Sequence, residues 1–202
     1  MKILTTTWSY DKDFDIKSTT LWQSFIKNNN PENFIHVHYN RNQFTTLEKE
    51  FKQRFGFQYE YILYKIFLLK DFIKNNIDDD IIFCDANDTA CLSCIDNIKP
   101  KETDVIFSRE INQYPSSLGD WGDNVQWSIN EINNRLFLNA GLLISTSSNY
   151  IKLLTSVVDN ILAKDLKSFG GDQGVYTYHY LLKNTPEIIL DENNNIFLST
   201  FN

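Results

Sequence analysis

The chain has 202 residues, of which 42% are hydrophobic and 14% aromatic, which is enough apolar material for one sizeable core, so we expect a single domain over residues 1–202. The formal net charge of −7 argues against binding to nucleic acid or to an anionic membrane, because both kinds of binding need clustered Lys and Arg. No apolar run approaches the roughly 18 to 20 residues of a membrane helix and the first ten residues lack a signal pattern, so we expect a soluble, cytoplasmic protein with no membrane segment.

Short β-rich runs alternate with helical patterns along the chain, which is typical of βαβ units. The expected elements, in chain order, are a strand at 2–7, a helix at 17–27, strands at 33–39 and 81–84 with a long helix at 59–75 between them, a short helix at 92–98, strands at 105–107 and 137–145, helices at 149–164 and up to 182, and one or two short final strands. The fold class is therefore α/β, with a mostly parallel central sheet flanked by helices. Residues 109–135 are polar and aperiodic, which indicates a long functional loop.

Histidines and cysteines suggest other metal or redox chemistry only weakly. His36 and His38 share one face of the strand at 33–39, because strand side chains alternate, and two histidines on one face can hold a metal. Cys91 and Cys94 form a single C-x-x-C, which we expect to pack on one face of the short helix rather than to bind zinc.

The most informative position is the end of the buried strand at 81–84. The apolar run stops abruptly at Asp85, and Asp88 follows three residues later. In an open α/β sheet, ligands gather beyond the carboxyl ends of the strands, and two carboxylates on a tight turn can share one Mg²⁺ or Mn²⁺. The alternative is a solvated turn with helix-capping duty. The sequence has no P-loop, no G-x-G-x-x-G after the first strand and no nucleophile elbow, so kinase, dinucleotide and hydrolase functions have no motif to support them.

Six blocks between residues 65 and 197 resemble, in order, the glycosyltransferase domain of the procollagen lysyl hydroxylase and collagen glycosyltransferase family. They are Lys65 to Lys70, Ile82 to Asp88, Phe107 to Glu110 with Tyr114-Pro115, Phe137 to Gly141, Gly171 to Gln173 with Tyr176-Thr177, and Leu190-Asp191 with Ile196-Phe197. The resemblance implies a GT-A-like nucleotide-diphospho-sugar transferase fold, a UDP-sugar donor, Mn²⁺ (or Mg²⁺), and transfer of glucose or galactose to a hydroxyl group of a protein or glycan acceptor.

The same resemblance implies roles for single residues. Asp85 and Asp88 are then the metal ligands, Lys65 faces the donor phosphates, and Asn139 and Asp172 lie around the sugar and the acceptor, with Asp172 as the catalytic carboxylate. The remaining implied residues are Asn87, Thr6 and Thr7 for the donor, the two threonines by analogy of fold, and Glu110, Tyr114, Gly141 and Gln173 for the acceptor or sugar. Simpler structural roles remain open: a solvated helix residue for Lys65, a helix N-cap for Asp172, and a β-bulge at Asn139 and Gly141.

The sequence departs from the family at two places. The family commonly has an aromatic residue inside Asp-x-x-Asp, where this chain has Asn87, and it has a late His-Asn-Gly segment whose histidine completes the metal site, which this sequence lacks after Phe197. The third ligand would then be His179, Asp191 or water. We therefore expect a metal-dependent UDP-sugar hexosyltransferase, with a non-catalytic sugar- or nucleotide-binding module on a degenerate transferase fold as the alternative.

Overall fold

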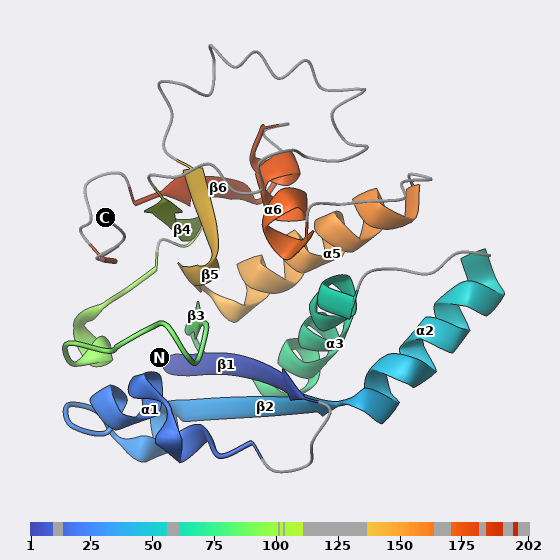
Figure 1. The fold of residues 1–202 in the computed structure, drawn as a ribbon. Coiled ribbons are helices and arrows are strands. Elements are labelled where there is room, and N and C mark those ends of the chain that lie inside the picture. Colours follow the sequence, from blue (N-terminus) through green and yellow to red (C-terminus); the bar gives the residue numbers. More distant parts are fainter. Residues whose placement is uncertain are drawn as a thin grey trace.

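The computed structural model describes residues 1–9, 14–55, 61–100, 102, 104–110, 137–163, 171–181, 185–191 and 196–197. Within this part of the chain, six strands form one sheet in the order β2-β1-β3-β5-β4-β6 (Figure 1). The strands are β1 (Lys2–Ser9), β2 (Phe34–Asn40), β3 (Ile81–Cys84), β4 (Asp104–Glu110), β5 (Phe137–Ser145) and β6 (Glu187–Leu190). Strand β5 is antiparallel to β3 and β4, whereas the other neighbouring pairs are parallel. The predicted mostly parallel α/β sheet is therefore confirmed.

Helices lie on both faces of this sheet. They are η1 (Ile16–Ser18), α1 (Thr20–Phe25), η2 (Pro31–Asn33), α2 (Arg41–Phe55), α3 (Tyr61–Asn76), η3 (Ile95–Asn97), α5 (Ser147–Ala163) and α6 (Gly171–Leu181), where η denotes a 3₁₀ helix. Several starts follow from local hydrogen bonds: Thr146 Oγ1 accepts from Asn149 N at 3.1 Å at the start of α5, and Thr19 Oγ1 accepts from Trp22 N at the start of α1. No described helix is long and apolar enough to cross a bilayer.

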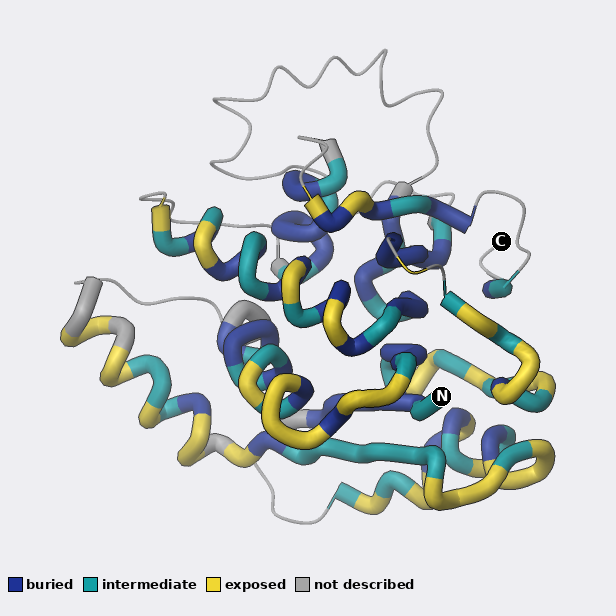
Figure 2. The backbone as a smooth tube through the Cα atoms, turned by 180° about the vertical axis from the view of Figure 1, so that it is seen from behind, coloured by how far each residue is buried: buried dark blue, intermediate teal, exposed yellow. Residues whose placement is uncertain are grey.

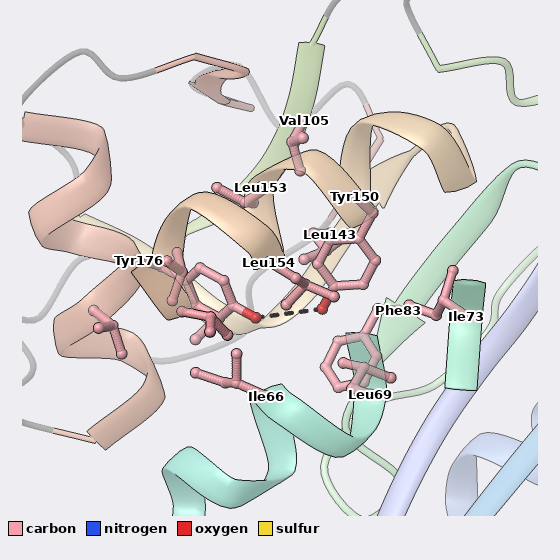
Figure 3. Packing of buried hydrophobic residues seen from close by; sticks show 14 of the residues in the cluster. Ile66, Leu69, Ile73, Phe83, Val105, Leu143, Tyr150, Leu153, Leu154 and Tyr176 are labelled. Carbon is pink, nitrogen blue, oxygen red and sulfur yellow. Dashed lines mark hydrogen bonds between the residues drawn. The ribbon is translucent and has the colours of Figure 1, made fainter. Parts of the chain in front are cut away.

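Two apolar clusters flank the sheet, because alternate side chains of each strand point to opposite faces. Along β3, Ile81 and Phe83 join the larger cluster formed with α3, α5 and α6, whereas Ile82 and Cys84 join a smaller cluster against α1 and η3. Figure 3 shows Phe83 packed between α3 and Tyr150 of α5 in the larger cluster. Buried and exposed residues alternate turn by turn along α5 (Figure 2), so its apolar stripe faces this cluster.

The sequence patterns gave no expectation for helix α2, which extends away from the sheet in Figure 1. Its start is marked by a capping box: Asn40 Oδ1 accepts from Gln43 N at 3.1 Å, and Gln43 Oε1 accepts from Asn40 N at 2.9 Å. Phe44, in the first turn, is only 2% exposed, whereas most described residues of the later turns are exposed. Phe44 and the partly buried Leu47 therefore anchor the first turns of the helix against the larger cluster.

The prediction of a short helix at 92–98 is wrong, since only the single 3₁₀ turn η3 forms there. The side chain of Asn29 explains the difference, because its Nδ2 donates to Ser93 O at 3.1 Å and its Oδ1 accepts from Ile95 N at 2.8 Å. These are backbone groups that a longer helix would use itself. Cys91 and Cys94 consequently do not share a helix face, and both are free thiols.

Candidate functional site

The site is built around Asp85, the first residue after β3. Its backbone N–H donates to Gly141 O on β5 at 2.8 Å, which fixes the position of the residue relative to the antiparallel strand. A Cβ at position 141 would collide with Asp85 Oδ2 and would lie 3.2 Å from Asn139 Oδ1. Only glycine leaves the Asp85 carboxylate in this place.

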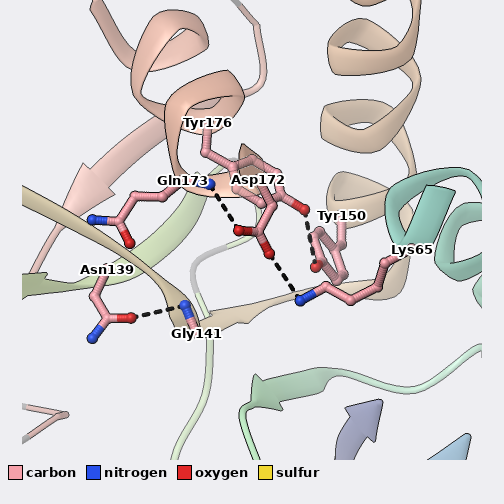
Figure 4. Close-up of polar contacts among 7 residues, drawn as sticks. All are labelled: Lys65, Asn139, Gly141, Tyr150, Asp172, Gln173 and Tyr176. Carbon is pink, nitrogen blue, oxygen red and sulfur yellow. Dashed lines mark hydrogen bonds and ion pairs between the residues drawn. The ribbon is translucent and has the colours of Figure 1, made fainter. Parts of the chain in front are cut away.

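The close approach at Gly141 follows from an irregularity in β5. Ser108 is opposite Asn139 and Phe107 is opposite Leu143, so three residues of β5 lie between two adjacent residues of β4. Within this bulge, Asn139 Oδ1 accepts from Gly141 N at 2.8 Å (Figure 4). The β-bulge alternative considered for these two residues is therefore present, and it places both of them beside Asp85.

On the face covered by the larger cluster, Asp85 neighbours an ion pair. Lys65 Nζ on α3 lies 2.8 Å from Asp172 Oδ2 at the start of α6, and the two side chains are only 13% and 15% exposed (Figure 4). The Lys65 ammonium also lies 5.7 Å from the centroid of the Phe83 ring. Lys65 is therefore not a solvated helix residue. Asp172 lies within α6 rather than before it, where its Oδ1 accepts from Gln173 N at 2.9 Å, so it is not an N-cap.

Asp172 contacts the Lys65 ammonium, and the Asp85 carboxylate acts on it electrostatically. Burial lowers the pKa of Lys65, but the carboxylates of Asp172 and Asp85 outweigh burial, and the net pKa is raised. Burial raises the pKa of Asp85 to about 6, Lys65 opposes that rise, and Asp172 and Asp88 add to it. The excess of negative charge around Asp85 makes the place suitable for a cation.

On the opposite face, Asp85 lines a cleft of about 330 Å³. Asp88, Ser108, Asn139 and Gly141 line the same cleft beside it. Cys84 forms part of the floor, where burial raises the pKa of its thiol, and the acidic groups nearby add to that effect. The structure thus brings Asp85, Asp88, Asn139 and Gly141 together at the carboxyl end of β3.

Other predicted residues lie outside that cleft. Lys65 and Asp172 lie on the face of the sheet opposite the cleft, and Gln173 is buried next to Asp172. Asn87 is exposed in the turn between Asp85 and Asp88. Tyr114 lies outside the described residues, and of Glu110 only the backbone, at the end of β4, is described.

Thr6 and Thr7 extend β1 past the end of β3, since Leu4 is paired with Phe83. The hydroxyl of Thr6 is buried and has no hydrogen-bond partner among the described residues. Thr7 points to the other face, where its Oγ1 lies 2.7 Å from His36 Nε2 and 2.9 Å from His38 Nδ1. The two histidines share a face as expected, and a threonine hydroxyl lies between them.

The donor set at Asp85 and Asp88 fits a hard divalent cation. Mn²⁺ and Mg²⁺ accept carboxylate oxygens and complete their shell with water or phosphate oxygens. Within the described ranges, no group of three or more His, Cys, Asp or Glu residues is arranged to hold a metal. The two residues offered as a third ligand have other contacts: His179 Nε2 lies 3.1 Å from Pro186 O, and Asp191 Oδ2 accepts from the backbone N–H groups of Ile196 and Phe197. Water or substrate would then complete the set.

Comparison with known proteins identifies the fold. No protein-family model and no curated protein matches the sequence. Among solved structures, mouse xyloside xylosyltransferase 1 is similar at 12% identity with a TM-score of 0.51, over 94% of this chain and 84% of that one. The bifunctional glycosyltransferase WbbM is similar at 12% identity with a TM-score of 0.52, over 94% of this chain but only 38% of that chain. The protein therefore has the GT-A-like fold of glycosyltransferase structures.

Proposed function

We propose that this protein is a metal-dependent glycosyltransferase that moves glucose or galactose from a UDP-sugar to an acceptor hydroxyl. One observation carries the proposal: Asp85 and Asp88 line one cleft at the carboxyl end of β3, while Asp85 also neighbours the buried Lys65–Asp172 pair. A fold shared with two glycosyltransferase structures supports it. The collagen glycosyltransferase family is the more specific assignment that the sequence blocks suggest.

In this reaction the bond between the anomeric carbon and the diphosphate oxygen breaks, and its electrons leave with UDP. The acceptor oxygen forms the new bond to the anomeric carbon, and its hydroxyl proton passes to a carboxylate. Asp172 and Glu110 are the two candidates from the sequence; because Asp172 is paired with Lys65 and does not line the cleft, Glu110 would take that proton.

Asp85 and Asp88 would hold the cation, Mn²⁺ or Mg²⁺, which when bound neutralises charge on the departing diphosphate. Lys65 would add a positive charge on the other side of Asp85. The bulge of β5 would place Asn139 next to the sugar, because Asn139 lines the cleft and is held by its bond to Gly141 N. Such preorganised groups cost no reorganisation during the reaction.

The test is UDP release from UDP-glucose and from UDP-galactose with Mn²⁺. We expect Asp85→Ala to lower the rate by about 10²-fold or more, the usual scale for losing a group that stabilises charge in the transition state. Asp79→Ala is the matched control, because Asp79 is exposed just before β3, at the opposite end of the strand from the site. Its rate should equal that of the wild type.

Equal rates in wild type and Asp85→Ala would contradict the proposal. UDP binding by calorimetry with no release from either donor would instead identify the non-catalytic binding module considered from the sequence. Phosphate release that does not depend on the sugar donor would indicate an ester hydrolase.

A further inference from the structure

The cleft has a polar end and an apolar end. At the polar end are the two acids with Ser108 and Asn139. The apolar end is formed by side chains of the smaller cluster: Leu21 of α1, Ile95 of η3, Leu142 of β5, and Ile98, Ile196 and Phe197. Thr89, Cys91 and Ser93 also line the cleft. Core residues form the floor of the cleft, since the side chains of Ile3 and Ile82 are only 2% and 6% exposed. The volume of about 330 Å³ is in the range of a small-molecule site.

The charge of the cleft restricts what the apolar end can hold. Its described lining contains two formal charges, both negative, and no Lys, Arg or His. A phosphate is therefore favoured only where a cation joins the acids, and the remainder of the cleft repels anions and offers them no compensating donor charge. An uncharged, largely apolar group fits it.

Leu92 extends this apolar surface to the rim. It is 74% exposed and lines the cleft, whereas the other exposed large hydrophobic side chain described, Ile26, is 44% exposed and does not line it. An apolar ligand that left the cleft at this rim would cover the Leu92 side chain and remove its apolar area from water.

We propose that the apolar end of this cleft binds the alkyl or aromatic group of an amphiphilic acceptor, whose sugar hydroxyl lies at the Asp85 and Asn139 end. The inference rests on the proposed function, since it names the acceptor class of that same site. The acceptor is an alcohol joined to an apolar group, such as an alkyl or aryl glycoside, rather than a free sugar.

The test is calorimetric binding of methyl, butyl, hexyl and octyl β-glucoside, each below its micelle concentration, to the full chain without donor or metal. We expect affinity to rise by about fourfold for each added methylene until the apolar end is filled, which follows from about 0.8 kcal/mol per buried CH₂. Two variants should weaken octyl glucoside binding: Ala90→Trp, which fills the cleft from an exposed lining position, and Leu92→Ser.

Ile26→Ser is the matched control and should bind octyl glucoside like the wild type, because it removes an exposed large hydrophobic side chain that does not line the cleft. The proposal is overturned if affinity does not depend on chain length. It is also overturned if Ala90→Trp and Leu92→Ser bind as well as Ile26→Ser, since binding would then occur elsewhere, or if uridine displaces the alkyl group.

A separate titration of UDP with Mn²⁺ keeps the two proposals apart. Chain-length dependence without metal-dependent UDP binding would support the apolar subsite and contradict the transferase function. Metal-dependent UDP binding without chain-length dependence would support the transferase function and contradict the apolar subsite.

Discussion

At the scale of single residues, the contact between Thr7 and two histidines couples the end of β1 to the proton concentration. The Thr7 hydroxyl lies within hydrogen-bond distance of one ring nitrogen of each histidine, and the tautomer of each ring decides which atom donates. The Phe14 ring packs against both imidazoles, with centroid distances of 5.7 Å to His36 and 6.1 Å to His38. Burial, and then the charge of His38, lower the pKa of His36 from 6.5. The fold therefore favours neutral His36.

This shift predicts a pH dependence of stability. Because the pKa of His36 is lower in the folded state, the unfolded chain binds the proton more readily, so its contribution to stability is present above pH 6.5 and is lost as the pH falls below it. Urea unfolding at pH 7.5 and at about pH 5.5 should show a smaller drop in midpoint for His36→Gln than for the wild type. An equal drop in both proteins would place the acid sensitivity at other groups.

Among site residues, the sequence located Asp85 at the end of a strand, but it did not indicate that Lys65 and Asp172 form an ion pair beside it. The abrupt change after an apolar run was enough to locate Asp85, because a buried strand must end where the polarity reverses. The ion pair of Lys65 and Asp172 joins residues more than 100 positions apart on two helices, and no local pattern reports such a contact. Their proximity is a product of tertiary packing.

At the scale of elements, the length of each predicted strand and helix depended on how complete its hydrophobic pattern was. Helix α3 and strand β3 carry continuous apolar signals and were placed to within two residues. Helix α2 was missed because most of its residues are polar, although Phe44, Leu47, Phe51 and Phe55 recur at helical spacing. The capping box at Asn40 and Gln43 is the local feature that could have located its start.

Asn40→Ala should lower the free energy of unfolding by about 1 kcal/mol, since it removes the acceptor for Gln43 N. Hydrogen exchange should quicken most in α2, whose start depends on this cap. Asn42→Ala, at an exposed position in the same turn, is the control and should change neither measurement appreciably. Unchanged exchange in Asn40→Ala would show that packing of Phe44 alone starts the helix.

At the scale of the whole molecule, the fold was predictable because the alternation of strands and helices is a global pattern that survives local errors. The antiparallel direction of β5 was not, since direction depends on which strands become neighbours, and its bulge was considered only as an alternative for Asn139 and Gly141. The net charge, in contrast, follows directly from the composition of the sequence. With a net charge of −7, the molecule surrounds its acidic cleft with a negative field that attracts cations.

Mn²⁺ affinity, measured by calorimetry, should therefore fall several-fold between about 20 and about 200 mM KCl, because salt shortens the Debye length from roughly 20 Å to under 10 Å. The double variant Asp78→Lys and Asp79→Lys changes two exposed residues and brings the net charge from −7 to −3, two units for each replacement. It should show a weaker salt dependence. An identical dependence in both proteins would assign the effect to the cleft acids alone.

The missing side chain at position 141 gives a criterion for sorting distant chains that share this architecture. A carboxylate after the third strand can keep the orientation seen here only where the facing residue of the antiparallel strand has no Cβ. Structural superposition could therefore separate chains in which that acid is held toward its neighbours from chains in which a larger residue has pushed it aside, even when the overall sequences no longer align.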